Sequence, residues 1–363
     1  MGDFAEGPLF PAVNKSAGYP SIPFILKEDY LWAEQVYRAG DMVALIARYK
    51  NIPKCLQKDL DQLVAQTYRK KLLTVPFLEA SLLLLAGGVL PEFRSLSRRL
   101  KEFCPAGRLY FEQLKAIAFV TSRNPDDLVV MVLRSGRLIA TMTLFPFCRN
   151  QDIPSLSYLE LDPTSAKLPD VQALEVGRLA KITCNGYGVE DSENKFMDMA
   201  CMAAAFMVSD RFIAENGLLA DSQSFICGDT HGTLITSLKR FFPLTVLDSK
   251  INPDMLMDTN DARGMSIYFI QRQILGSFES VNDLDAAIQK VGRSDPAAAH
   301  RIRKLLESGL KTLGAASIHQ FDPQKFRVHF FHFPYRHPDT RKGLARMAQM
   351  MRWMTNRPAA LLN

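Results

Sequence analysis

The chain has 363 residues, of which 47% are hydrophobic and 23% are charged, with a formal net charge of +6 at pH 7. This length supports a substantial core and more than one domain-sized unit, and the balance is that of an ordinary soluble globular protein. Six cysteines are scattered without a CxxC pair, so we expect neither a zinc site nor a disulfide framework. Reduced thiols in a cytoplasmic compartment are the simpler interpretation.

The first third of the chain predicts helices. Residues up to about 30 are rich in Pro and Gly and predict an irregular lead-in that lacks the features of a signal peptide. From about 28 to 100 the apolar spacing is helical, so we expect residues 1–105 to form a helical N-terminal region. The apolar stretch 72–90 contains Pro76, Glu79 and a Gly-Gly pair, which suit a buried helix better than a membrane span.

Strands are predicted in the middle of the chain. A further helix over 109–120 precedes two β-rich runs, 128–134 and 137–145, which flank Ser135-Gly136 and therefore predict a hairpin. A loop punctuated by prolines then leads to a strand over 174–181.

That strand carries Glu175 and Arg178 within an otherwise apolar segment. Alternate side chains of a strand face opposite ways, so the two charges would lie on opposite faces unless a bulge re-aims one of them. Because burying either charge unpaired is costly, this segment is the first candidate for a working site.

The remaining elements alternate helices and strands. A helix over 196–216 ends at Asn216-Gly217, as a C-terminus should, and a strand over 224–227 runs into Gly228-Asp229-Thr230-His231. The later segments predict a helix over 232–242, strands near 244–247 and 265–270, helices over 283–313, a strand over 326–333 and an amphipathic basic helix around 344–354.

The order of elements over about 108–275 resembles that of the GNAT acyltransferase superfamily. Glu175-x-x-Arg178-Leu179 resembles the E-x-x-R-[LF] signature of the branch containing acyl-homoserine-lactone synthases and long-chain N-acyl amino acid synthases, and 225–231 resembles the family's fifth strand. The resemblance implies a mixed α/β (α+β) fold, with a GNAT-like mixed central sheet flanked by helices. We expect an acyltransferase domain over 106–280, preceded by the helical N-terminal region and followed by a helical and basic extension over 281–363.

The resemblance also implies where the acyl donor would bind. In such enzymes the fourth and fifth strands splay apart and hold an acyl-CoA or acyl-phosphopantetheine thioester, whose phosphate meets the start of the next helix. Thr183, Asn185, Gly186 and Gly188 have the spacing of the family's phosphate loop, although Thr183 replaces the usual Gln or Arg and an acidic run follows. The resemblance implies no metal and no permanently bound cofactor.

Four residues are the candidate catalytic group, each with a plainer interpretation. Glu175 would be the general base or grip the acceptor's ammonium group, or else form a structural ion pair. Arg178 would order the active-site loop through bidentate bonds to a carboxylate, or lie on the surface. His231, just past a strand end, could shuttle a proton with Asp229 orienting it, or be a loop histidine without a role.

Other side chains favour structural roles. His329, His332 and His337 invite a metal-site hypothesis, but positions i and i+3 of a strand face opposite ways, so we expect no metal. Cys184 and Cys227 are interpreted as core residues. The methionines of the 196–216 helix are interpreted as core packing or as an adaptable wall of an acyl tunnel.

The C-terminal tail is strongly basic. Residues 321–363 contain eight Lys or Arg and two Asp, a surplus equal to the net charge of the whole chain. It could dock an acidic acyl carrier protein, contact an anionic membrane peripherally, or be a solvated face. No recognition motif accompanies the charge, so nucleic acid is a poor partner.

The sequence therefore predicts an N-acyltransferase that moves a fatty acyl group from a carrier-protein or CoA thioester to the amine of an amino acid or related small metabolite. The alternative is a catalytically silent GNAT-like module that binds an acyl chain or a partner protein.

Overall fold

The computed structural model describes residues 30–39, 42–72, 75–91, 123–149, 153–157, 159–161, 168–181, 191–247, 249–251, 272–312, 317–318, 321–323 and 326–355. Within these ranges an eight-stranded mixed sheet is flanked by helices, which confirms the predicted mixed α/β class.

The main sheet runs in the order β1-β2-β3-β4-β6-β7-β10-β8, and β6–β7 is its parallel pair. Its other neighbouring strands are antiparallel. The strands are β1 (Gln35–Ala39), β2 (Met42–Arg48), β3 (Leu128–Arg134), β4 (Arg137–Phe147), β6 (Ala173–Lys181), β7 (Phe225–His231), β8 (Thr245–Leu247) and β10 (Val328–Pro334), with β5 (Leu159–Leu161) and β9 (Ser249–Ile251) forming a separate antiparallel pair.

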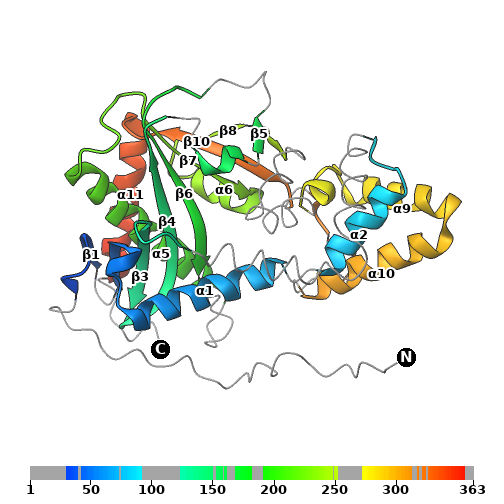
Figure 1. Cartoon of the computed structure of the whole chain (residues 1–363), viewed down its shortest axis with the longest axis horizontal. Coiled ribbons are helices and arrows are strands. Elements are labelled where there is room, and N and C mark those ends of the chain that lie inside the picture. The colour runs from blue at the N-terminus through cyan, green and yellow to red at the C-terminus, as the bar shows by residue number, and fades with distance from the viewer. Residues whose placement is uncertain are drawn as a thin grey trace.

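Helices cover both faces of the sheet (Figure 1). Helix α5 lies on one face with α11 beside it, and the long helix α1 crosses the other face and leads toward a group formed by α2, α9 and α10. The helices are α1 (Lys54–Leu72), α2 (Val75–Ala86), α5 (Asp191–Glu215), α6 (Gly232–Leu238), α9 (Val281–Ser294), α10 (Pro296–Thr312) and α11 (Pro338–Thr355), with 3-10 turns η2 (Tyr49–Asn51) and η5 (Pro154–Ser157).

The predicted hairpin is present as β3 and β4. Ser135 and Gly136 at its turn have φ values of 47° and 76°, and a two-residue turn with two positive φ angles matches the twist of the flanking strands. Strand β3 is buried at six of its seven residues because helices cover both faces of the sheet, which accounts for its unbroken apolar sequence.

The prediction that residues 28–100 are helical is wrong for 35–39 and 42–48, which form β1 and β2. Strand β2 is buried on both faces, so its apolar residues do not alternate with polar ones and their spacing imitates a helix. The helical prediction is confirmed for α1 and α2, and the latter is buried at Phe77, Leu78 and Leu84. No helix in the described part of the chain is long and apolar enough to cross a bilayer.

The sheet also crosses both expected domain boundaries. Strands β1 and β2 come from 1–105 and β10 from 281–363, so the three expected segments do not separate the sheet from its extensions. The strand predicted over 326–333 and the helix predicted around 344–354 are confirmed as β10 and α11. The helix predicted over 109–120 and the strand near 265–270 lie outside the described residues.

Small residues bring the α2–α9–α10 helices close together. A Cβ at Gly309 would lie 2.9 Å from the Phe77 ring, and one at Gly87 would lie 2.6 Å from Val291. Phe77 also meets Phe326, at the start of the β10 segment, in an edge-on contact with ring centroids 5.3 Å apart. This helical group is therefore tied to the sheet through aromatic packing.

Candidate functional site

A β-bulge lies at the centre of the predicted signature. Thr141 pairs with Ala180 and Thr143 with Gly177, so β6 has one residue more than β4 across this interval. Two residues of β6, Arg178 and Leu179, therefore lie opposite the single residue Met142 of β4. Arg178 has a φ of 52°, a left-handed value that a non-glycine residue rarely adopts. The strand thus contains the kind of bulge that can re-aim one of the two charges.

The bulge places Arg178 on the same face as Glu175. Phe145 is the cross-strand partner of Glu175, so these two side chains share a face of the sheet. The Arg178 guanidinium lies over the Phe145 ring, 5.5 Å from its centroid. The two charges of the signature thus flank one aromatic ring instead of facing apart.

Glu175 is buried, with 3% of its surface exposed. The backbone N–H of Ser155, in η5, donates to Glu175 Oε2 at 3.0 Å, and the Ser155 hydroxyl is hydrogen-bonded to Glu175 Oε1. Burial, and next the charge of Asp229, raise the pKa of Glu175 from its ordinary value of 4.5 to about 8, although the Ser155 hydrogen bonds act in the opposite direction. A carboxyl group with such a pKa carries a proton most of the time at neutral pH.

Strand β7 adds two side chains to this face. Cys227 is the parallel partner of Glu175, and Asp229 comes two residues later on the same side of β7. Asp229 Oδ1 lies 3.1 Å from the Ser155 hydroxyl oxygen. Burial, and then the two carboxylates, hold the pKa of Cys227 well above its ordinary value, so this residue is a buried thiol. That agrees with the prediction of a core residue and argues against a nucleophilic thiolate.

The pairing of β6 with β7 ends at these residues. Their pairing consists of three positions, which end at Glu175 and Cys227, after which β6 pairs with β4 alone and β7 with β10 alone. Gly228 marks the last close approach, because a Cβ there would lie 2.7 Å from the Val176 carbonyl oxygen. The parallel pairing therefore ends at the level of Glu175, where the resemblance predicts that the strands splay.

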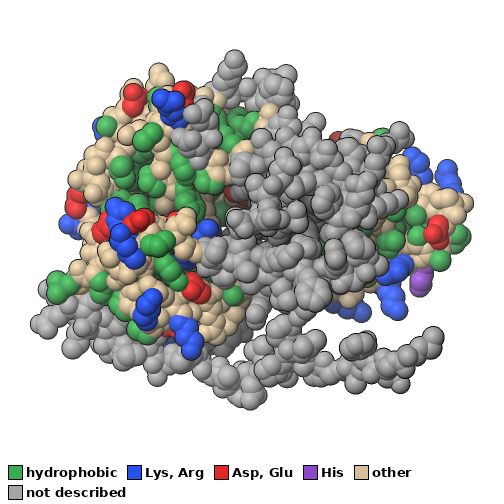
Figure 2. Space-filling model, in the orientation of Figure 1, with side chains coloured by type: hydrophobic (Ala, Val, Ile, Leu, Met, Phe, Trp, Pro, Cys, Tyr) green, Lys and Arg blue, Asp and Glu red, His purple; other side chains and the backbone are tan. Residues whose placement is uncertain are grey.

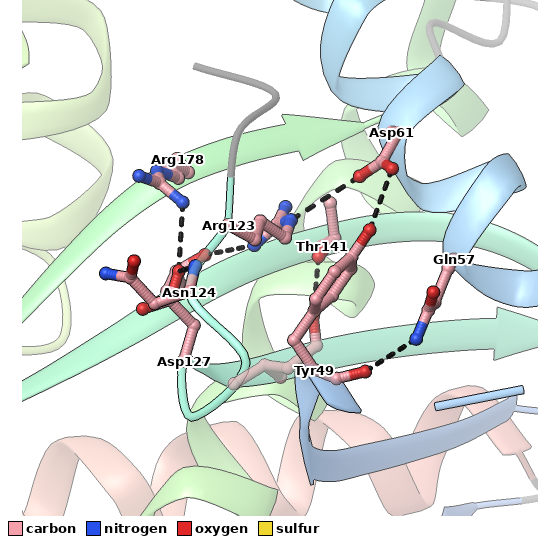
Figure 3. A network of polar contacts seen from close by, with 10 residues as sticks. Tyr49, Gln57, Asp61, Arg123, Asn124, Asp127, Thr141 and Arg178 are labelled. Atoms are coloured by element: carbon pink, nitrogen blue, oxygen red, sulfur yellow. Dashed lines mark hydrogen bonds and ion pairs between the residues drawn. The ribbon is translucent and has the colours of Figure 1, made fainter. Parts of the chain in front are cut away.

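Arg178 forms its ion pair with Asp127 and not with Glu175, the carboxyl group of the signature (Figure 3). Its Nη1 atom lies 3.1 Å from Oδ2 of Asp127, a residue at the start of β3 with 7% of its side chain exposed. Asp127 also accepts from the backbone N–H of Asn124 at 3.1 Å. Arg178 thus forms a single ion pair and not the bidentate bond expected from the sequence, and its role in ordering the active-site loop stays a prediction.

The same region contains a network that the sequence did not reveal. Arg123 Nη1 donates to Thr143 Oγ1 at 2.6 Å, and its Nε lies 3.7 Å from Asp61 Oδ1, while the Tyr49 hydroxyl donates to Asp61 Oδ2 at 2.9 Å. The Arg123 side chain has no exposed surface, and burial together with Arg178 lowers its pKa to about 10, so it stays charged at neutral pH. The network joins α1 to the sheet beside the bulge.

Distance along the chain explains why this network was missed. Tyr49, Asp61 and Arg123 come from η2, α1 and the segment before β3, and no local motif links them. Ser155 was missed for the same reason, since a serine after a proline in a loop carries no signal of its own. The one available hint was the burial cost of the Glu175 charge, which requires a partner somewhere in the fold.

The other candidate residues lie wholly or partly outside the described part of the chain. His231 is the last residue of β7, and its side chain is outside the described part. Thr183, Asn185, Gly186 and Gly188 also lie outside the described residues, as does Cys184; their segment connects β6 to α5.

Two of the three histidines of the metal hypothesis have separate surroundings. His332 packs edge-on against Phe225 with centroids 5.6 Å apart, and burial lowers its pKa, whereas His337 Nδ1 accepts from the backbone N–H of Asp339 at 3.2 Å. Across the described ranges, no group of three or more His, Cys, Asp or Glu side chains is placed to hold a metal ion.

Comparison of the chain with protein-family models, with curated proteins and with solved structures finds no match. Function is therefore inferred from the geometry of the site.

Proposed function

We propose that the protein is an N-acyltransferase that moves a fatty acyl group from an acyl-carrier-protein or acyl-CoA thioester to the amine of an amino acid or a related small metabolite. The observation that carries the proposal is the position of Glu175, a buried carboxyl group at the point where β6 and β7 stop pairing.

A base at this position suits aminolysis of a thioester. The attacking amine must lose a proton, and a base works best when its pKa lies near the working pH. The pKa of about 8 for Glu175 meets that requirement, whereas an ordinary glutamate is too weak a base. Glu175 is also buried, and burial strengthens the electrostatic effect of a proton transfer in the site.

The end of the pairing between β6 and β7 offers a binding mode for the thioester. Beyond Glu175 and Cys227 the facing edges of β6 and β7 no longer pair with each other, so their backbone groups can bond an extended ligand between them. A phosphopantetheine arm is such a ligand, because it is extended and contains two amides. This reasoning applies equally to CoA and to a carrier protein, since both present the same arm.

Arg178 acts in this proposal as a positioning residue. Its contacts with Asp127 and the Phe145 ring fix the bulge next to Glu175. Arg178→Lys retains the positive charge but loses the planar stacking, so we expect lower turnover with nearly unchanged donor affinity.

The basic C-terminal region is the proposed dock for an acidic carrier protein. Arg341 is engaged within the chain, since its Nη1 lies 2.6 Å from Asp210 Oδ1 and its guanidinium stacks on Tyr335. Arg346, on the same helix α11, is exposed. Further exposed basic side chains lie outside residues 321–363, on α9 and α10, and Figure 2 shows Lys and Arg on that helical group. Binding through them should weaken with added salt.

The test is product formation. The full chain is incubated with acyl-CoA or acyl-carrier-protein donors and a mixture of amino acids, and N-acyl amides are sought by mass spectrometry. We expect a new amide with wild-type protein, its loss in Glu175→Gln, and its retention in the control Glu215→Gln, whose carboxylate is exposed on α5. Tight retention of acyl species without any amide would favour the silent binding module.

A further inference from the structure

One hydroxyl group connects the two carboxyl groups of the site. Ser155 is fully buried, and its Oγ atom lies within hydrogen-bonding distance of Glu175 Oε1 and, at 3.1 Å, of Asp229 Oδ1. The backbone N–H of the same serine donates to the second oxygen of Glu175. From its place in η5, Ser155 therefore bridges a side chain of β6 and a side chain of β7.

The number of protons on Glu175, Ser155 and Asp229 decides which of their contacts are hydrogen bonds. A serine hydroxyl has a single proton to donate, whereas an ionised carboxylate only accepts. If both carboxyl groups were ionised, the hydroxyl could donate to one of them and would turn a lone pair toward the other. Both contacts are hydrogen bonds only if one carboxyl group itself carries a proton and donates it to Ser155 Oγ.

Glu175 is the group that carries the proton. It is 3% exposed while Asp229 is half-buried, and the charged form is disfavoured most in the more buried group. No Lys, Arg or His in the described residues forms an ion pair with Glu175; the nearest cation of the signature, Arg178, contacts Asp127 instead.

We propose that Glu175 and Asp229 share one proton through the hydroxyl of Ser155, and that this three-residue unit, not Glu175 alone, is the proton acceptor of the site. Glu175 Oε1–H donates to Ser155 Oγ, and Ser155 Oγ–H donates to Asp229 Oδ1. Ser155 and Asp229 are positioning residues, and this part of the inference rests on the proposed acyl transfer.

The unit can balance the protons of aminolysis. A concerted shift moves the Glu175 proton to Ser155 and the Ser155 proton to Asp229, which leaves Glu175 ionised. The amine nitrogen then forms a bond to the thioester carbonyl carbon, and its proton passes to Glu175. When the C–S bond breaks, its electron pair leaves on sulfur, and the thiolate takes a proton back from the unit. The products are an amide and a thiol, and the unit again holds one proton.

Two described side chains beside Glu175 add no charge to this count. Cys227, next to Glu175 on β7, is a thiol, and His332, its partner on β10, is held neutral by burial. Neither Cys227 nor His332 therefore offers Glu175 a positive charge that would favour its ionised form.

Infrared spectroscopy of the full chain tests the shared proton without a substrate. We expect the carbonyl band of a protonated carboxylic acid at pH 6, absent in Glu175→Gln and retained in Glu215→Gln, with a titration midpoint near pH 8. Asp229→Asn removes a neighbouring negative charge and should lower that midpoint by roughly 1 pH unit. Ser155→Ala keeps the backbone N–H but removes the hydroxyl hydrogen bond that lowers the pKa of Glu175, so it should raise the midpoint.

The titration midpoints of Asp229→Asn and Ser155→Ala should shift in opposite directions, whereas a general loss of structure would not produce opposite shifts. A missing band at pH 6, or a midpoint that Asp229→Asn leaves unchanged or raises, overturns the shared proton even if Ser155→Ala does not fold. If the band behaves as expected but no donor gives an amide, the proton unit stands and the proposed acyl transfer fails.

Discussion

Replacing Glu175 with glutamine should make the protein more stable at high pH. A carboxyl group whose pKa is raised from 4.5 to about 8 on folding holds a proton in the native state that the unfolded state has lost. Stability then falls as pH rises through this window, by about 1.4 kcal/mol per pH unit and by about 5 kcal/mol over the whole window. Glutamine cannot ionise, and it imitates the protonated acid because its carbonyl can accept from the Ser155 N–H and its amide can donate to the Ser155 hydroxyl.

Urea denaturation between pH 5 and pH 9, followed by circular dichroism, measures this effect, since urea is uncharged and does not screen the site. We expect the free energies of unfolding of wild type and Glu175→Gln to agree within about 1 kcal/mol at pH 5. At pH 9 the variant should be the more stable by at least about 3 kcal/mol. The control Glu215→Gln should follow the wild type. Parallel pH profiles of wild type and Glu175→Gln would refute a proton on the buried carboxyl group.

Three further substitutions test the surrounding structure by the same denaturation assay. Gly228→Ala places a Cβ 2.7 Å from the Val176 carbonyl oxygen and should cost about 2 kcal/mol, because the backbone must move. An unchanged urea midpoint would contradict this close approach of β6 and β7. Arg123→Met removes the cation of the partly exposed Asp61 and the hydrogen bond to Thr143, and should cost about 1 kcal/mol; a neutral or stabilising result would show that the network is not a tie between α1 and the sheet. Tyr335→Phe removes a 2.7 Å hydrogen bond to a carboxylate on α5 and should cost about 1 kcal/mol, with no loss expected if that bond is absent in solution.

Local chemistry made the strongest features of the fold predictable. The Ser135-Gly136 turn between two β-rich runs predicts a hairpin because few other backbone conformations suit that pair of residues between strands. The end of α5 is similarly predictable, since Gly217 has a φ of 63° and the Leu218 N–H donates to the Ile213 carbonyl oxygen in a helix-closing bond.

Burial of both faces of the sheet explains why the first strands, β1 and β2, were predicted as helix. Helix and strand patterns differ only when one face is polar, and β2 has helices on both faces of its sheet. Residues such as Leu45 and Ile46 therefore carry an apolar signal without a period that identifies a strand.

The candidate site was half predictable. Two charges in an apolar strand identify Glu175 and Arg178, because burial without partners is costly. Their partners, Ser155, Asp127 and Asp229, come from three other segments, and only the sheet order and the bulge bring them together. A sequence pattern shows that partners are needed but not where they come from.

A comparison of donor affinity with turnover in Glu175→Gln shows whether this residue is the base of the site. Binding of an acyl-CoA or acyl carrier protein is measured by calorimetry and amide formation by mass spectrometry on the same samples. We expect donor affinity within about threefold of wild type and turnover lower by at least roughly 100-fold, the contribution expected of a general base. Unchanged turnover in this variant would show that Glu175 is not the base.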